Sequence, residues 1–516
     1  MECRKYQVLA VLVLSVFCRQ VNGTTYFVSP TGSDSHNGTS ASPWLTLQHA
    51  ADVVHAGDFV TVATGNYTGF DLETSGTAAA PIEFFAQPGV VINQRNATTP
   101  DGINLEGASY VTIDGFTVNG MPRAGVRSVG DSDALAKFVT VRHVTAANNG
   151  EWGIFTGFVD DLLIESNTTS GSVDQHGIYV SNSGDRPIIR NNISFNNHDN
   201  GIHMNGDASQ GGDGIITGAV VTGNIIYNNG TGGGSGINMD GVQNSVIANN
   251  LLYNNHASGI SLYKEDGGGS SSGDVVANNT IIEPSNARWD LNIQNGSTSD
   301  TVRNNILLNN NPSHGAIDIS PDSLSGFSSD YNVVTPTFTT DDGDTFLNLA
   351  QWQATGNDTH SFATAVQLFA NSAANDYHLN TGSPAVNAGT SFDAAFADLE
   401  GGARPAGGIF DIGAYELGAL VGDFNRDGVV DTADYVLWRN SVGATVTRYS
   451  GADGDGSGVI DQADYAIWRS GFGVAAGAGS GIGAAAVPEP TWVADLCVAM
   501  ALLTTMRRVP KSLSRV

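Results

Sequence analysis

The chain has 516 residues and a formal net charge of −29. That charge disfavours nucleic acid and anionic membranes as partners of the surface as a whole. Only 14% of the residues are charged and 64 are glycine, which suits short strands and turns better than helices. At this length the core is either divided or elongated and repetitive.

Residues 1–23 resemble a secretion signal. Arg4 and Lys5 precede an apolar run from Val8 to Phe17, and a basic start before a short apolar core is typical of a signal peptide. We therefore expect bacterial-type export, with the mature protein secreted or associated with the cell envelope.

Residues 24–100 begin with a strand pattern, a loop rich in Gly and Asp, and a short helix. The pattern Gly-Asp-x-Val-x-Val follows from Gly57. We expect this segment to cover one end of the fold that the next 240 residues form.

A Gly–apolar–any–apolar pattern recurs through residues 101–340 at spacings of 23 to 35 residues. Two short strand-like pieces lie between successive copies, as in "VTIDGFTV". Such a period predicts a solenoid, here a parallel β-helix with its Ile, Val and Leu inside. We expect nine turns of about 4.8 Å each, or roughly 43 Å of coil. The copies begin at Gly102, Gly125, Gly153, Gly177, Gly201, Gly236, Gly259, Asp290 and Ala316.

Pairs of asparagines mark the turns of this repeat. Asn tolerates left-handed turn conformations, and its amide both donates and accepts. Stacked Asn amides could therefore satisfy turn backbone inside the coil, so we assign the second residue of each pair to structure. The predicted column is Asn167, Asn192, Asn224, Asn250, Asn279 and Asn305.

The repeats resemble the right-handed parallel β-helix proteins of the pectate-lyase-like superfamily. Residues 26–69 look like the N-terminal cap of such enzymes, and residues 383–416 are similar to their closing segment. The resemblance implies a mainly β protein with a cap and first turns in 24–100 and a closing segment in 341–418. It does not imply one reaction, because the fold serves lyases, glycosidases, epimerases and passive surface proteins.

In each copy of the repeat, the third and fifth positions should face outward. The middle turns then gather aromatic and polar side chains on one face, beside inserted loops at 207–218 and 264–274, as suits sugar binding. The predicted substrate-binding residues are Trp152, His176, Tyr179, Asn205 and Tyr263, and the predicted catalytic residues are Lys264, His203 and Asp240.

The leading hypothesis is a polysaccharide lyase that cleaves a uronic-acid glycan by β-elimination. A base removes the proton beside the carboxylate, and a cation stabilises the charge that develops there. Lyases of the superfamily often use Lys or Arg with carboxylate-held Ca²⁺, which implies Lys264 as base and Asp207 as a possible calcium ligand. His203 is the competing base, and Asp240 is a ligand or an orienting group.

Other interpretations remain open. The histidines and Lys264 could be solvated surface groups, and Asp207 and Asp240 could only cap turns. A glycoside hydrolase using Asp207, Asp240 and Glu265 is the runner-up, followed by a uronan epimerase. A non-catalytic glycan-binding surface protein is the alternative that is not an enzyme.

Residues 420–472 contain two twelve-residue loops, 423–434 and 453–464, each followed by a helical pattern. Both have Gly at position 6 and oxygen ligands at the spacing that Ca²⁺ requires. The duplication resembles a dockerin, which implies two Ca²⁺ ions and a cohesin-type protein partner. Asp431 and Asp461 should also cap the helices. The predicted ligands are Asp423, Asn425, Asp427, Val429, Asp431, Asp434, Asp453, Asp455, Ser457, Val459, Asp461 and Asp464.

The C-terminal end carries a Gly/Ala-rich stretch and a second targeting pattern. Residues 473–486 have the composition of a flexible linker. Residues 487–516 contain "VPEP", an apolar run and two arginines. This order resembles the bacterial PEP-CTERM sorting signal, which implies a processing protease at the cell envelope as a further partner.

Overall fold

The computed structural model describes residues 23–406, 408–446 and 450–475. Two compact units make up the chain: Met1–Glu400 with Gly408–Leu417, and Gly401–Gly407 with Gly418–Val516. The predicted signal sequence up to residue 22, the linker from 476 and the sorting tail 487–516 lie outside the described residues.

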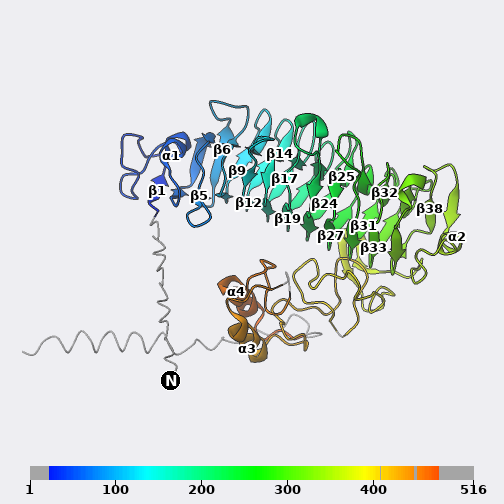
Figure 1. The fold of residues 1–516 in the computed structure, drawn as a ribbon. Coiled ribbons are helices and arrows are strands. Elements are labelled where there is room, and N and C mark those ends of the chain that lie inside the picture. Colours follow the sequence, from blue (N-terminus) through cyan, green and yellow to red (C-terminus); the bar gives the residue numbers. More distant parts are fainter. Residues whose placement is uncertain (1–22, 407, 447–449, 476–516) are drawn as a thin grey trace, which may run out of the picture. The chain divides into compact units, whose positions relative to one another are not determined.

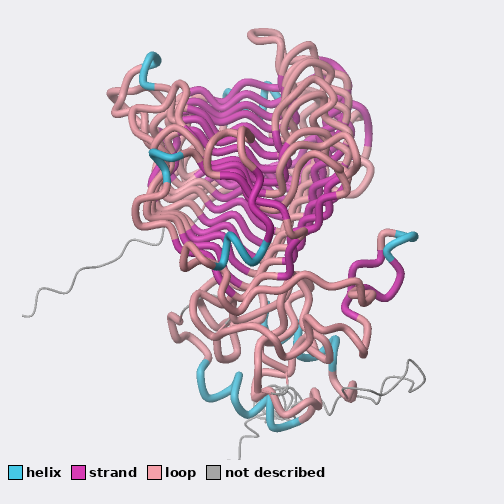
Figure 2. Tube along the Cα trace, turned by 90° about the vertical axis from the view of Figure 1, so that its right-hand side faces the viewer, coloured by secondary structure: helices cyan, strands magenta, loops and turns pink. Residues whose placement is uncertain are grey.

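The first unit is a parallel β-solenoid in which each turn passes through three sheets in the same order (Figures 1 and 2). Sheet 1 has twelve strands: β1 (Thr25–Val28), β2 (Phe59–Val62), β5 (Ile82–Ala86), β8 (Val111–Asp114), β12 (Val139–Arg142), β16 (Leu163–Glu165), β19 (Ile188–Arg190), β23 (Val220–Thr222), β27 (Val246–Ala248), β30 (Val275–Ala277), β33 (Thr301–Arg303) and β36 (Ser328–Asp330).

Sheet 2 has eleven strands: β3 (Gly65–Thr68), β6 (Val90–Gln94), β9 (Thr117–Asn119), β13 (Thr145–Ala147), β17 (Thr168–Ser170), β20 (Ile193–Phe195), β24 (Ile225–Tyr227), β28 (Leu251–Tyr253), β31 (Thr280–Glu283), β34 (Ile306–Asn309) and β37 (Val333–Val334). Sheet 3 has twelve: β4 (Phe70–Leu72), β7 (Ile103–Glu106), β10 (Ala124–Val129), β14 (Trp152–Gly157), β18 (Ile178–Ser181), β21 (Ile202–Asn205), β25 (Ser235–Asp240), β29 (Ser258–Tyr263), β32 (Leu291–Ile293), β35 (Ile317–Ile319), β38 (Thr337–Thr339) and β39 (Phe346–Asn348).

Three two-stranded sheets complete the strands: β11 (Ala136–Lys137) with β15 (Val159–Asp160), β22 (Ile216–Thr217) with β26 (Val242–Gln243), and β40 (Phe369–Asn371) with β41 (Asp376–Leu379). The predicted parallel β-helix is confirmed, but nine turns are too few. The coil already includes turns before residue 101, because Gly69 and Phe70 begin the same Gly–apolar pattern at β4. It continues through β38.

Sheet 3 shows how the repeat divides its side chains between core and surface. Ile178 pairs in register with Ile202, and Tyr179 pairs with His203. The isoleucines are completely buried, whereas the side chains between them face outward. Removing the isoleucines from water stabilises each turn by about 2 kcal/mol per side chain. The third position of the repeat therefore faces outward in these two copies, as predicted.

The predicted Asn column forms a continuous hydrogen-bonded ladder between sheets 1 and 2. The Oδ1 atom of Asn192 accepts from the backbone N–H and Nδ2 of Asn167 at 2.9 and 3.0 Å. The residue before each ladder Asn takes the left-handed conformation, for example Asn191 with φ 56°. A second ladder that the sequence analysis did not assign joins sheets 2 and 3: Asn197, Asn229 and Asn255.

Both ends of the coil are covered, as Figure 1 shows for α1 (Leu47–Val53) and α2 (Leu349–Gln353). Leu47, the first residue of α1, is buried in the core. In α2, the fully buried Trp352 stacks on Phe338 of β38 at 4.9 Å. The closing segment then packs Leu368 and Tyr377 among apolar residues of sheet 2.

The second unit contains α3 (Thr432–Ser441) and α4 (Gln462–Gly471). Asp431 and Asp461 accept hydrogen bonds from the first turns of these helices, which confirms their predicted capping role. The indole of Trp438 in α3 donates to the carbonyl of Asp461, the residue before α4. The indole of Trp468 in α4 donates to the carbonyl of Asp431, the residue before α3. Each helix is therefore hydrogen-bonded to the start of the other. In the described part of the chain, no helix has the length and apolarity needed to cross a membrane.

Candidate functional site

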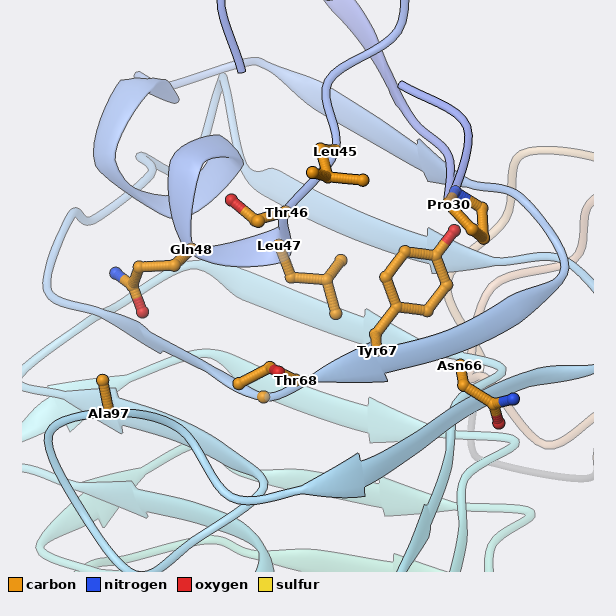
Figure 3. Close-up of a pocket in the computed structure, with 10 residues that line it drawn as sticks. Pro30, Leu45, Thr46, Leu47, Gln48, Asn66, Tyr67, Thr68 and Ala97 are labelled. Atoms are coloured by element: carbon orange, nitrogen blue, oxygen red, sulfur yellow. The ribbon is translucent and has the colours of Figure 1, made fainter. Parts of the chain in front are cut away.

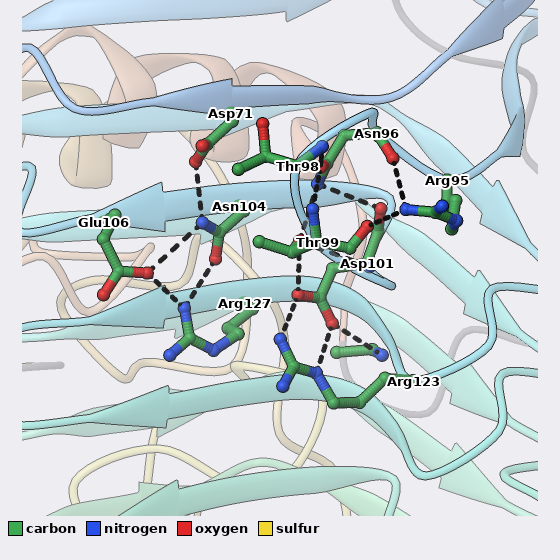
Figure 4. A network of polar contacts seen from close by, with 11 residues as sticks. Asp71, Arg95, Asn96, Thr98, Thr99, Asp101, Asn104, Glu106, Arg123 and Arg127 are labelled. Atoms are coloured by element: carbon green, nitrogen blue, oxygen red, sulfur yellow. Dashed lines mark hydrogen bonds and ion pairs between the residues drawn. The ribbon is translucent and has the colours of Figure 1, made fainter.

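The outer face of sheet 3 carries a polar network on its first turns (Figure 4). Asn104 donates to Asp71 at 2.7 Å. Arg127 donates to Asn104 at 2.8 Å and pairs with Glu106 at 2.5 Å. The Arg127 charge is therefore neutralised inside the network, which makes this region a poor site for an anionic ligand.

An aromatic cluster follows on the next turns of the same face. Trp152 on β14 stacks on Phe155 with ring centroids 4.3 Å apart. Phe155 meets Tyr179 edge to face at 5.3 Å, and Tyr179 stacks on His203 at 4.8 Å. The structure thus brings together the predicted Trp152, Tyr179, His176 and His203, with Phe155 added. Such a platform offers ring faces to the apolar side of a sugar.

A hydrogen-bond chain assigns the hydrogens of the two histidines. The backbone N–H of Asn200 donates to Nδ1 of His176 at 3.3 Å, so a neutral His176 carries its hydrogen on Nε2. That Nε2 lies 3.1 Å from Nδ1 of His203, which must accept. The hydrogen of His203 is then on its Nε2, which is buried and has no partner among the described residues.

Burial keeps both histidines neutral. It lowers the pKa of His203 to about 4. Burial, assisted by His203, also lowers the pKa of His176 well below its usual value. In the assigned tautomer a neutral His203 offers an N–H donor rather than a lone pair, so the arrangement favours a donor role over the predicted role of base.

The predicted acids on this face hold loops. Asp240 is 1% exposed, and its carboxylate accepts from the backbone N–H groups of Glu265, Asp266 and Gly267 at 2.8–3.0 Å. Asp207 is bound by Ser209 through its N–H at 3.0 Å and its hydroxyl at 2.6 Å. Both carboxylates order the inserted loops that flank the aromatic cluster.

The two loops also determine where the remaining predicted residues lie. Asn205 at the end of β21 contacts the Tyr179 hydroxyl at 3.4 Å. Lys264 is exposed directly after β29, and it has no recorded partner within the described ranges. Tyr263 receives a hydrogen bond from Asn238 at 3.0 Å. Burial raises the pKa of the Tyr263 hydroxyl, so that hydroxyl stays protonated.

Tyr263 lines a cavity of about 570 Å³ on the outer face of the later turns of sheet 3. We call it the central cavity. Most of its wall comes from the strands β25, β29, β32 and β35 and the residues just before them. The cavity is lined by Gly234, Ser235, Asn238, Ser258, Ser261, Tyr263, Glu265, Arg288, Trp289, Asn292, His314, Asp318 and Asp342. Aromatic rings, a guanidinium and carboxyl groups therefore surround one space.

Most of these residues were not among the sequence candidates, including Arg288, His314 and Asp318. His314 packs edge to face on Trp289 at 5.3 Å, and burial together with the Arg288 charge lowers the pKa of His314. A signal for His314 exists in the sequence, because it precedes Gly315 as the predicted His176 precedes Gly177.

A second hollow of about 380 Å³ lies at the start of the coil (Figure 3). It is lined by Pro30, Leu45, Thr46, Leu47, Gln48, Asn66, Tyr67, Thr68, Gly69 and Ala97. The hydroxyl of Tyr67 is already bound to the carbonyl of Ala63 at 2.6 Å. No carboxylate or cation lines this hollow, so it lacks acid–base groups.

The second unit brings predicted calcium ligands together. Carboxylate oxygens of Asp453, Asp455 and Asp464 all lie within 4.8 Å of one another, a donor set that fits one hard cation. In the first loop, the carboxylate of Asp434 accepts from the N–H groups of Asn425 and Asp431. The remaining predicted ligands lie in the same two loops: Asp423, Asp427, Val429, Ser457, Val459 and Asp461.

The coil and its outer-face cavity define a pectate-lyase-like right-handed β-helix protein. The model of the family "Pel9A-like, right handed beta helix region" matches residues 26–283. The chain belongs to this family of Pel9A-like β-helix proteins.

Solved structures and one curated relative are similar to the chain. The crystal structure of pectate lyase Pel9A is 16% identical with a TM-score of 0.54, covering 77% of this chain and 96% of that chain. An alginate lyase from Paenibacillus sp. str. FPU-7 is 20% identical with a TM-score of 0.43, covering 52% and 93%. Uncharacterized protein YwoF of Bacillus subtilis (strain 168) is 25% identical over 216 residues, which is 36% of this chain and 44% of that protein. The chain thus spans less than half of that relative.

Proposed function

We propose that the first unit is a carbohydrate-active enzyme, and that it cleaves an acidic polysaccharide by β-elimination in the central cavity. The observation that carries this proposal is the lining of that cavity. Arg288 supplies a guanidinium beside the rings of Trp289 and Tyr263. Rings bind sugar faces and a guanidinium binds a carboxylate, so one space meets both needs of a uronate.

In this reaction a base removes the proton next to the uronate carboxylate, and Arg288 stabilises the charge that develops there. We assign the base to Lys264, which is exposed and lies in the sequence between Tyr263 and Glu265, two residues that line the cavity. We assign His203 a donor role instead, because its tautomer offers an N–H. The aromatic cluster from Trp152 to Tyr179 would hold further sugars of the same chain.

The charge of the cavity adds a requirement. The carboxyl groups of Glu265 and Asp342 outnumber the Arg288 guanidinium among its lining residues even when Asp318 is protonated, so a divalent cation should favour an anionic substrate. Ca²⁺ fits that need, since carboxylates are ligands that calcium prefers. Asp207 lies outside this lining, so as the calcium ligand it would exchange its bonds to Ser209 for a bond to the ion.

The direct experiment is a digestion of pectate, alginate and neutral glycans with and without a chelator. A lyase gives products that absorb as unsaturated uronates. Lys264→Ala should abolish them, whereas the matched variant Lys137→Ala should not, because Lys137 pairs with Asp160 at 3.8 Å on another part of the coil. Full activity of Lys264→Ala removes Lys264 as the base.

A glycoside hydrolase is the second candidate, because three carboxyl groups line the central cavity. Asp207 and Asp240 hold loops, so the acids for hydrolysis would be Glu265 and Asp318. New reducing ends without unsaturated products would select this function. Epimerised uronate in an uncut polymer would select a uronan epimerase, and binding without any product would select a glycan-binding surface protein.

For the second unit we propose a dockerin-type module that binds two Ca²⁺ ions and attaches the enzyme to a cohesin-type protein. The converging carboxylates of Asp453, Asp455 and Asp464 support it, as does the reciprocal packing of Trp438 and Trp468. Export through the signal sequence and processing of the sorting tail by an envelope protease complete the proposal.

A further inference from the structure

We propose that Asp318 is the general acid of this site and that it donates a proton to the departing glycosidic oxygen. This inference rests on the proposed function, since it requires cleavage of a glycosidic linkage. It holds for elimination and for hydrolysis alike, because the oxygen that leaves must gain a proton in both reactions.

Asp318 lies where a catalytic group would be expected, with its side chain in the cavity and without a role in holding the coil together. Its side chain lines the central cavity from β35. It is only 7% exposed, yet its Oδ1 has no hydrogen-bond partner among the described residues. A buried carboxyl oxygen without a partner costs about 1–3 kcal/mol. A ligand group placed in the cavity would remove that cost.

The other acids near this cavity contrast with Asp318. Asp240 accepts three backbone N–H groups, as described above. Asp341 accepts from the N–H of Thr345 at 2.8 Å and from the hydroxyl of Thr339 at 2.9 Å. Both oxygens of Asp240 and Oδ1 of Asp341 are occupied by the fold, whereas Oδ1 of Asp318 is available to a substrate oxygen.

The groups around Asp318 favour its protonated form. Burial raises its pKa to about 6, with smaller contributions from the charges of Asp342 and Asp341, while a hydrogen bond from Gln294 opposes the change. Asn292, its neighbour in register on β32, is uncharged. The remaining charged or titratable residues that line the cavity are Glu265, Arg288, His314 and Tyr263. A carboxyl in this setting carries a proton in weakly acidic solution.

In the elimination step, the base takes the proton from C5 of the uronate, the electron pair forms the C4–C5 double bond, and the C4–O4 bond breaks. The proton of Asp318 passes to O4, which becomes the hydroxyl of the leaving sugar. Asp318 is left as a carboxylate and regains its proton from water before the next turnover.

The test compares Asp318→Asn, which keeps the shape but has no acidic proton, with the wild type and with Asp344→Asn, an exposed Asp→Asn control. Asp318→Asn should lower kcat by about 10²–10⁴-fold and leave KM nearly unchanged. The wild-type rate should fall as pH rises through about 6, and Asp318→Glu should restore part of that pH limb.

A substrate with an aryl leaving group decides between an acid and a structural residue. Such a group departs without protonation, so Asp318→Asn should cleave it nearly as fast as the wild type. A variant equally slow on both substrates, with unchanged circular dichroism and melting temperature, overturns the inference. So does a variant as active as the wild type on natural glycan. If the wild type cleaves no glycan, the proposed function fails instead.

Discussion

Oδ1 of Asn224 accepts the backbone N–H and the side-chain Nδ2–H of Asn192, each at 3.0 Å. Asn224 in turn donates to the carbonyl of Ile189 at 2.9 Å and to Oδ1 of Asn250 at 3.0 Å. One amide therefore satisfies polar groups on three turns of the coil, all of them away from water.

Removing this amide should destabilise the coil strongly. Asn224→Ala leaves two donors of Asn192 without an acceptor, so we expect the free energy of unfolding to fall by about 4 kcal/mol. Urea denaturation followed by circular dichroism measures it. Asn93→Ala is the matched control, because Asn93 is exposed and makes one long hydrogen bond of 3.4 Å. Equal effects of the two substitutions would contradict the structural role of the ladder.

The carboxyl groups of a third ladder should make stability depend on pH. Asp300 accepts from the backbone N–H of Asp274 at 2.9 Å, and burial raises its pKa to about 7. The folded state therefore holds this proton where the unfolded state, with a pKa near 4, has released it. The contribution is fully present below pH about 4 and is lost as pH rises through about 7.

Asp300→Asn should remove that loss, since the amide oxygen still accepts from Asp274 and no charge forms. We expect the variant to be more stable than the wild type at pH 8 by about 4 kcal/mol, given about 1.4 kcal/mol for each of the roughly three pKa units, and nearly equal at pH 4. Denaturation curves across this range, with the exposed Asp52→Asn as control, measure the difference. A difference that does not vary with pH would rule out Asp300 as its source.

The aromatic cluster should bind sugars away from the reacting bond. Trp152→Ala should raise KM for a long glycan about 10-fold, since stacking of an aromatic ring on a sugar contributes about 1–2 kcal/mol to binding. The substitution should change kcat little, because Trp152 lies away from the reacting bond. Tyr227→Ala is a control from sheet 2, where Tyr227 stacks on Phe195 at 4.9 Å. If Tyr227→Ala weakens binding as much as Trp152→Ala, the glycan does not follow sheet 3.

Calcium should bind twice in the second unit. Titration calorimetry on the whole chain should give two tight sites there, and Asp455→Asn should remove one, because an uncharged amide replaces a ligand carboxylate. Asp393→Asn, an exposed substitution in the first unit, should leave the stoichiometry unchanged. Chelation should lower the melting temperature of the second unit. Unchanged binding in Asp455→Asn would exclude this loop as a calcium site.

The fold was predictable where one residue type repeats at one turn position. The column from Asn167 to Asn305 identified the sheet 1 to sheet 2 turn directly, because each amide contacts the next. The second column was not predicted, because Asn occupies its position on only three successive turns, at Asn197, Asn229 and Asn255. The first turns within 24–100 were expected from the resemblance alone and were not counted among the nine repeats, because a single Gly–apolar copy at Gly69 precedes residue 101.

The site was only partly predictable for a related reason. Register places Tyr179 beside His203 whatever the loops do, so the aromatic cluster followed from spacing. The central cavity depends on how long each connection is and where it folds back, which spacing does not encode. Arg288 and His314 come from such connections, and Asp318 gains meaning only from its burial and its unpartnered oxygen.

The last strand of sheet 3 limits how far this architecture can extend. All earlier neighbours in that sheet run parallel, so any exposed final strand would be a template for another copy of the chain. β39 pairs with β38 in the antiparallel direction and leads straight into α2. At sheet 3, a second molecule therefore meets a reversed strand and a helix in place of a parallel edge, which disfavours end-to-end stacking of coils through this sheet.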